Sequence, residues 1–139
     1  MSEENKALAR KFLQMFELGE PSVADEIVAA DYYNHDAPDP NLGSEGVKAG
    51  VTMFKNALPD AQLNIAFQLA EEDKVVTRYT WSGTHLGEYY GIPATGKRVN
   101  WTSTVTFRID DGKIREAWLN SDRLGLMQQL GVVPTLGPE

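Results

Sequence analysis

Three side chains of this sequence have the chemistry to exchange a proton with a bound molecule. Asp122 lies in the stretch WLNSDRLGLMQQLG, which alternates like a strand up to Asp122 and then recurs like a helix. His35 and His85 are the only histidines in the chain. Imidazole titrates near neutral pH, and a carboxyl group does so when it is kept from water. These three residues are therefore the candidate catalytic acids and bases.

The dipeptide Asp111-Gly112 predicts a two-residue hairpin turn, because both residues tolerate the positive φ angles of a type I′ turn. An uninterrupted antiparallel register then sets the following residues opposite one another and on one face of the sheet: Ile109 and Ile114, Val105 and Trp118, Ser103 and Asn120, Trp101 and Asp122.

In this register Asp122 faces the indole of Trp101 inside an apolar concavity, where we expect the pKa of its carboxyl group to rise. The alternative is a structural role, because Asp is among the best helix N-caps and the residues from Arg123 onward are helical. A one-residue slip would turn all these side chains to the other face. Spacing alone favours the cap and leaves both roles open.

The two histidines have different settings. His85 shares strand parity with Tyr79 and Trp81, which predicts a place on an aromatic wall. His35 lies in a loop beside Asn34, where a substrate can reach it. A lone histidine is nevertheless more often structural or solvated.

Other kinds of site find little support. His35, Asp36 and Asp39 are close in sequence but lack a metal-ligand spacing, so we expect no metal. The loop GIPATGKR resembles a phosphate-binding loop, yet Arg98 replaces its Ser/Thr and a strand follows in place of a helix. The chain has no cysteine and no G-x-S-x-G motif, which argues against a nucleophilic triad.

Composition indicates one soluble domain over residues 1–139, with 42% hydrophobic residues and a net charge of −7. No Lys/Arg cluster offsets that charge, so nucleic acid and anionic membranes are poor partners. The start MSEENKALARKF has no apolar stretch for a signal peptide, and no run is long enough to span a membrane. We expect a cytoplasmic protein.

Helical periodicity comes first along the chain. Leu8, Phe12, Leu13 and Phe16 form an apolar stripe that ends before Gly19. Ser22 and Asp25 resemble a capping signal for a short helix reaching Val28. The stretch NHDAPDPNLG predicts a loop. A further helix is predicted from Ser44 to about Ala57, with an apolar stripe of Val47, Val51 and Phe54.

From Gln62 the period changes to two. Leu63, Ile65, Phe67 and Leu69 predict one apolar strand face, and Glu71–Asp73 predicts a hairpin turn. Three more strand-like stretches follow, KVVTRYTWSGTH, RVNWTSTVTFRI and KIREAWLNSD, and then a short helix with a Pro/Gly tail. Helices followed by antiparallel strands favour an α+β fold with helices on one face of a curved sheet.

Several of these stretches resemble the SnoaL-like polyketide cyclases, a branch of the NTF2-like superfamily. The resemblance extends from the first helix to Gly131 and rests on YYNHDAP, GTHLGEYYGIPATGKRV and DGKIREAWLNSDRLGLMQQLG. It implies a cone-shaped α+β barrel with a deep apolar pocket. It also implies intramolecular aldol cyclisation of an aromatic polyketide ester without metal or organic cofactor, in a homodimer or larger homo-oligomer.

The resemblance assigns the general acid/base to Asp122 and pocket positions to Asn34, His35 and His85. For a small apolar carbonyl compound, we expect flat contact surfaces and orienting amides from the following residues: Tyr79, Trp81, Trp101, Trp118, Asn34 and Asn120. Two rival interpretations stay open, a non-catalytic ligand-binding domain and a dimerisation module. Related isomerases, dehydratases and hydrolases share the fold, so the fold alone does not choose the reaction.

Overall fold

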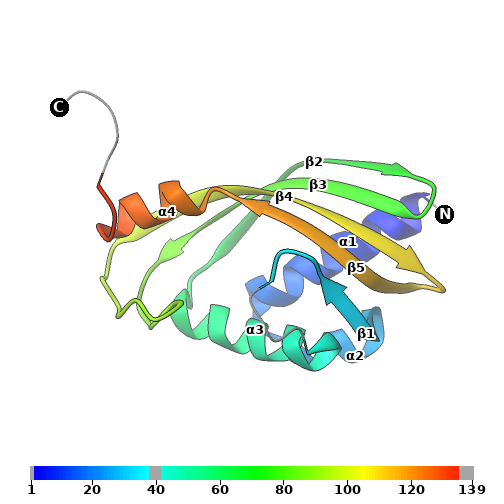
Figure 1. Ribbon diagram of the computed structural model, residues 1–139, viewed down its shortest axis with the longest axis horizontal. Coiled ribbons are helices and arrows are strands. Elements are labelled where there is room, and N and C mark those ends of the chain that lie inside the picture. Colours follow the sequence, from blue (N-terminus) through cyan, green and yellow to red (C-terminus); the bar gives the residue numbers. More distant parts are fainter. Residues whose placement is uncertain (1, 38–41, 135–139) are drawn as a thin grey trace.

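The computed structural model describes residues 2–37 and 42–134 (Figure 1). Its elements follow in this order: α1 (Ser2–Leu18), the 3-10 helix η1 (Pro21–Val23), α2 (Ala24–Ile27), β1 (Val28–Asn34), α3 (Gly43–Ala57), β2 (Gln62–Glu71), β3 (Lys74–Thr84), β4 (Arg98–Asp110), β5 (Lys113–Ser121) and α4 (Arg123–Leu130).

The strands form one sheet with the order β1-β5-β4-β3-β2. The pairs β2–β3, β3–β4 and β4–β5 are antiparallel, whereas β1 pairs with β5 in parallel. The predicted α+β class with a curved sheet is confirmed, and β1 is an addition that the sequence did not indicate. Its burial does not alternate regularly, so it carries no period-two pattern to detect.

Helices α1, α2 and α3 lie together on one side of the sheet, and α4 extends from the end of β5 (Figure 1). The apolar stripes predicted for α1 and α3 are confirmed, since Phe12, Leu13, Val51 and Phe54 are buried. Their side chains pack with Phe107 of β4 in one hydrophobic core. No helix within the described ranges is both long and apolar enough to cross a membrane.

The short helix after Gly19 forms without the predicted cap. Residues Pro21–Val23 make a 3-10 turn, and Val23 occupies the N-cap of α2 with no side-chain hydrogen bond. Ser22 therefore does not cap a helix, because the 3-10 turn has already begun one residue before it.

The β4–β5 hairpin begins as predicted and then changes register. Asp111 and Gly112 have positive φ angles, and Ile109 lies opposite Ile114. An irregularity beyond Ile109 leaves Arg115 unpaired, and from there Ser103 lies opposite Ser121. The predicted pairs of Val105 with Trp118, Ser103 with Asn120 and Trp101 with Asp122 are wrong, because this β-bulge shifts the register by one residue and reverses the faces of β5.

A second bulge has the same effect on β2. Ile65 lies opposite Tyr79 and Phe67 opposite Arg78, so Ala66 is the additional residue. Leu63 and Ile65 are partly buried against the core, whereas Phe67 and Leu69 are 53% and 62% exposed. The prediction of one continuous apolar face is therefore wrong beyond Ile65.

We expect the two phenylalanines Phe107 and Phe67 to differ sharply in their contribution to stability. Phe107 is fully buried, so Phe107→Ala should lower the free energy of unfolding by about 3–5 kcal/mol through lost burial and the cavity left behind. Phe67→Ala, at an exposed position, is the matched control and should cost about 0.5 kcal/mol. Urea unfolding followed by circular dichroism measures both, and equal losses would contradict the packing described.

Candidate active site: an aromatic cavity between sheet and helices

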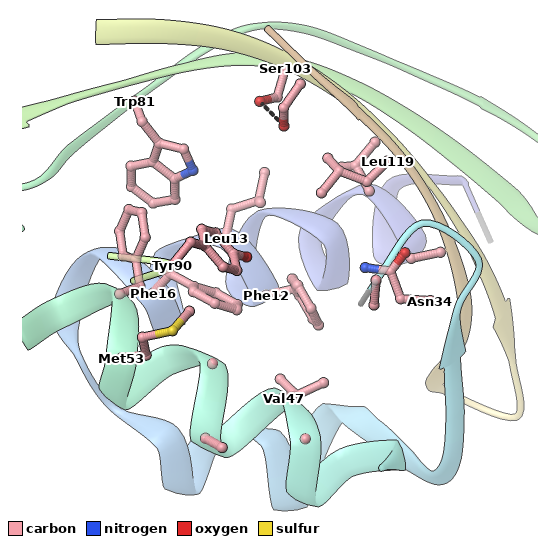
Figure 2. A pocket seen from close by; sticks show the side chains of 18 of the residues that line it. Phe12, Leu13, Phe16, Asn34, Val47, Met53, Trp81, Tyr90, Ser103 and Leu119 are labelled. Carbon is pink, nitrogen blue, oxygen red and sulfur yellow. Dashed lines mark hydrogen bonds between the residues drawn. The ribbon is translucent and has the colours of Figure 1, made fainter. Parts of the chain in front are cut away.

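A cavity of about 460 Å³ lies between the sheet and helices α1, α3 and α4, a volume typical of small-molecule sites. Figure 2 shows Trp81 and Asn34 on opposite sides of it, with Val47 and Met53 projecting from α3. Most of the wall is aromatic or aliphatic, and its larger apolar members include Phe12, Leu13, Phe16, Met53, Phe54, Trp81, Tyr89, Trp101, Phe107, Leu119, Leu126 and Met127.

Four of the predicted substrate-contacting residues line this cavity: Asn34, Tyr79, Trp81 and Trp101. Trp81 and Trp101 lie directly opposite each other on β3 and β4. The ring of Phe54 on α3 packs against both, with centroid separations of 4.6 Å to Trp81 and 6.4 Å to Trp101. These rings supply the flat apolar surface that the sequence predicts.

Asp122 does not point into the cavity. Its side chain is exposed, and its Oδ1 accepts a hydrogen bond of 2.9 Å from the backbone N–H of Gly125, which makes it the N-cap of α4. Its backbone N–H donates to the carbonyl oxygen of Thr102, so Asp122 does not lie opposite Trp101. The predicted inward orientation is wrong because the β5 bulge reverses the strand, whereas the predicted cap is confirmed. The chain neighbours Ser121 and Arg123 do line the cavity.

The same reversal places Trp118, Asn120 and His35 outside the cavity. Trp118 stacks face to face on His35, with ring centroids 4.6 Å apart and an angle of 4°. The imidazole Nε2 of His35 lies 2.9 Å from Glu116, which also pairs with Arg108. The hydrogen bonds from His35 and then Arg108 hold the pKa of Glu116 below its usual range. Asn120 is exposed opposite Thr104, so the cavity positions predicted for these three residues are wrong.

His85 is buried but does not line the cavity, so its predicted place on the aromatic wall is also wrong. Its Nδ1 accepts the backbone N–H of Thr95 at 3.2 Å, which leaves the proton of a neutral ring on Nε2. Its backbone bonds to Lys97 and Gly96 tie the loop between β3 and β4 in place. In the part of the chain described, Nε2 has no hydrogen-bond partner.

Two groups of cavity residues were not singled out from the sequence. Tyr89, Tyr90 and Arg123 meet at one end, where the Arg123 guanidinium lies 5.5 Å from the centre of the Tyr90 ring. Gly46 and Gly50 line the cavity from α3. A glycine inside a helix costs about 0.5–1 kcal/mol of stability relative to alanine. Two glycines within the predicted helix therefore indicated, from the sequence, a helix face kept free of side chains.

Hydroxyl groups form the main polar part of the wall. Tyr79, Ser103 and Ser121 lie opposite one another on three neighbouring strands, and Tyr32 of β1 lines the same cavity. The Oγ atoms of Ser103 and Ser121 are 2.8 Å apart (Figure 2), and the Ser103 side chain also hydrogen-bonds to Tyr79. Burial raises the pKa of Tyr79 to about 12 and also raises that of Tyr32.

None of the described residues that line the cavity carries a carboxylate or an imidazole. Across the described ranges, no three His, Cys, Asp or Glu side chains gather as a metal site would require. Asp39, considered above as a possible ligand beside His35 and Asp36, lies outside the described residues. The cavity therefore offers aromatic surface, hydroxyl groups, the Asn34 amide and the Arg123 guanidinium.

Comparison with known proteins identifies relatives along most of the chain. The sequence is 30% identical over 128 residues to the aklanonic acid methyl ester cyclase DnrD of Streptomyces peucetius, covering 89% of this chain and 88% of that protein. It is 31% identical to the aklanonic acid methyl ester cyclase DauD of Streptomyces sp. strain C5, with coverage of 89% and 80%. The structure of TsrD from Streptomyces laurentii superposes with a TM-score of 0.87 at 31% identity, covering 94% of this chain and 97% of that one.

The sequence model of the SnoaL-like polyketide cyclases matches residues 6–130, which run from the first turns of α1 to the end of α4. The α+β class with its curved, unclosed sheet agrees with the fold of these relatives. The chain belongs to the SnoaL-like polyketide cyclase family.

Proposed function

We propose that this protein catalyses the intramolecular aldol cyclisation of a polyketide-derived ester, using side chains and no cofactor. The observation that carries the proposal is the aromatic cavity of about 460 Å³ in a chain of the polyketide cyclase family. The two DnrD and DauD relatives are named for aklanonic acid methyl ester, which makes this compound the first substrate to test.

The cavity can lower the barrier by folding the substrate. Both reacting carbons belong to one molecule, and the cavity can hold them close together. The conformational entropy is then lost when the substrate binds, and not on the way to the transition state. The rings of Phe54, Trp81 and Trp101 provide surfaces against which a flat conjugated substrate can stack. Asn34, on the opposite side, has an amide that can orient a substrate oxygen.

Asp122 is the group we propose for proton transfer, acting from the edge of the cavity. Only Oδ1 is engaged in the cap, and Oδ2 makes no hydrogen bond with any described residue. Gly125 keeps space for the carboxylate, since an added Cβ would lie 2.8 Å from the Asp122 Cγ. Its chain neighbours Ser121 and Arg123 line the cavity, and the proposed role requires a side-chain rotation at Asp122 that brings the free oxygen towards the substrate.

In the proposed reaction, the Asp122 carboxylate takes a proton from a carbon flanked by carbonyl groups. The electron pair of that C–H bond forms an enolate, whose carbon attacks a second carbonyl of the same molecule. The new alkoxide then receives a proton from the carboxyl group, which restores the carboxylate. His35 and His85 are given no proton-transfer step, because neither lines the cavity.

One observation favours a second function, binding of a small apolar molecule without turnover. The described cavity wall has no carboxylate or imidazole, so every surface of a bound ligand would meet rings, aliphatic groups, hydroxyls, an amide or Arg123. The homodimer expected from the resemblance stays a prediction for either function.

Exchanging Asp122 for Asn separates proton transfer from capping. Asn caps a helix about as well as Asp but cannot take the proton, so Asp122→Asn should retain wild-type stability and lose roughly 10²–10⁴-fold in kcat on aklanonic acid methyl ester. Asp122→Ala, the control for the cap, should also lower the free energy of unfolding by about 1 kcal/mol. Cyclisation rates and the midpoints of urea unfolding are measured for each variant. A wild-type kcat in Asp122→Asn would refute the acid–base role. Ligand binding without turnover by the wild-type protein would support the second function.

Filling the cavity from α3 tests whether the substrate binds there. A Cβ at Gly50 would meet Phe16 at an ordinary 3.8 Å, so Gly50→Ala should keep activity and raise the free energy of unfolding by about 0.5–1 kcal/mol. Gly50→Leu extends into the cavity and should raise KM by roughly tenfold or more. Steady-state kinetics of both variants make the comparison, and unchanged KM in Gly50→Leu would show that the substrate binds elsewhere.

A further inference from the structure

The hydroxyl row of Tyr79, Ser103 and Ser121 is built by the pairing of three strands. Tyr79 lies opposite Ser103 across β3 and β4, and Ser103 lies opposite Ser121 across β4 and β5. All three side chains therefore project from the same face, and all line the cavity. Tyr79 and Ser103 are almost fully buried, at 4% and 1% exposure. Figure 2 shows the bonded serine pair facing the apolar groups that project from α1 and α3.

This row has hydrogen-bond donors to spare. Its three hydroxyls share two mutual hydrogen bonds, between Tyr79 and Ser103 and between Ser103 and Ser121. Each bond uses one O–H group, so one of the three remains to donate to a ligand. The Tyr32 hydroxyl makes no hydrogen bond with any described residue and provides a second donor. Since these residues line the cavity, a ligand oxygen bound there can accept from their free O–H groups.

The phenols remain donors at neutral pH. Burial raises the pKa of Tyr79 to about 12, although its bond to Ser103 opposes that rise, and burial with the nearby Tyr79 raises the pKa of Tyr32. Both groups therefore keep their protons during the reaction. In the apolar surroundings of this cavity, a hydrogen bond to an oxygen that gains negative charge is stronger than it would be in water.

We propose that the row Tyr79–Ser103–Ser121, together with Tyr32, is an oxyanion-binding site that stabilises the enolate oxygen of the substrate. This inference rests on the proposed cyclisation and adds the group that holds its developing charge. As the base removes the proton, the C–H electron pair becomes a C=C bond and the carbonyl π pair moves to oxygen. That oxygen accepts hydrogen bonds from the free O–H groups. It becomes a carbonyl oxygen again when the enolate carbon forms the new C–C bond. The hydroxyls transfer no proton.

The test uses two readouts on the intact protein, one of which needs no turnover. Turnover of aklanonic acid methyl ester gives kcat and KM. The bound fraction of 1-phenylbutane-1,3-dione present as enolate, read from its ultraviolet absorption against pH, reports directly on oxyanion stabilisation. Tyr79→Phe keeps the ring and removes the donor, and Ser103→Ala removes the middle hydroxyl of the row.

We expect Tyr79→Phe to lower kcat by roughly 10²-fold with little change in KM, because the interaction strengthens only as charge develops. It should also reduce the bound enolate at a given pH by about tenfold, equivalent to a rise of one unit in the pKa of the bound probe. Ser103→Ala should change both quantities in the same direction by smaller factors. Thermal unfolding confirms that each variant is folded.

Thr77→Val is the matched control, since Thr77 is a fully buried hydroxyl on the same strand that bonds to Gln68 and does not line the cavity. It should leave kcat and the probe titration unchanged. Equal probe titrations in the wild type, Tyr79→Phe and Ser103→Ala would overturn the oxyanion site even if the wild type cyclises the ester, and so would failure of the wild type to bind the probe. A wild type that fails to cyclise esters but shows the variant-dependent titration would overturn the proposed function and support the hydroxyl site.

Discussion

The β-bulge that leaves Arg115 unpaired between β4 and β5 decides which side chains this protein presents to its cavity. One additional residue shifts the register, so Ala117, Leu119 and Ser121 face inward while Glu116, Trp118 and Asn120 face outward. A bulge also increases the local twist of the strand pair, which helps a sheet curve around a cavity. The same bulge therefore determines which side chains of β5 line the cavity and which lie on its outer surface.

The outward side chains have a structural use on the other face. Trp118 stacks on His35, and Glu116 joins His35 to Arg108. Nearby, the Asp36 carboxylate accepts the backbone N–H of Leu119 at 2.7 Å. These contacts hold the end of β1 against β5, and Asn34 reaches the cavity from that end. The histidine thus positions the wall of the site without belonging to it.

Features that depend on neighbouring residues were predictable from the sequence, and features that depend on strand pairing were not. The stripes of α1 and α3, the Asp111-Gly112 turn and the cap by Asp122 follow from local spacing and were confirmed. The bulges in β2 and β5 leave no local sign, because each depends on how the whole sheet curves. Tyr79, Trp81 and Trp101 lie on β3 and β4, which pair without a bulge and keep a regular alternation, so their placement was correct. Trp118, Asn120 and Asp122 follow the bulge in β5, so theirs was not.

The distribution of polar groups suits the proposed chemistry for an electrostatic reason. A carboxylate enclosed by rings would be disfavoured in its charged form and would be a protonated acid when the enzyme needs a base. Asp122 instead lies outside the ring of aromatic side chains, exposed to water, and caps the N-terminal turn of α4. Neutral hydroxyls pay a smaller desolvation cost and lose nothing by keeping their protons, so Tyr32, Tyr79 and Ser103 can be buried where the charge develops. The buried phenols thus lie where the protonated form that the proposed oxyanion site requires is the stable one.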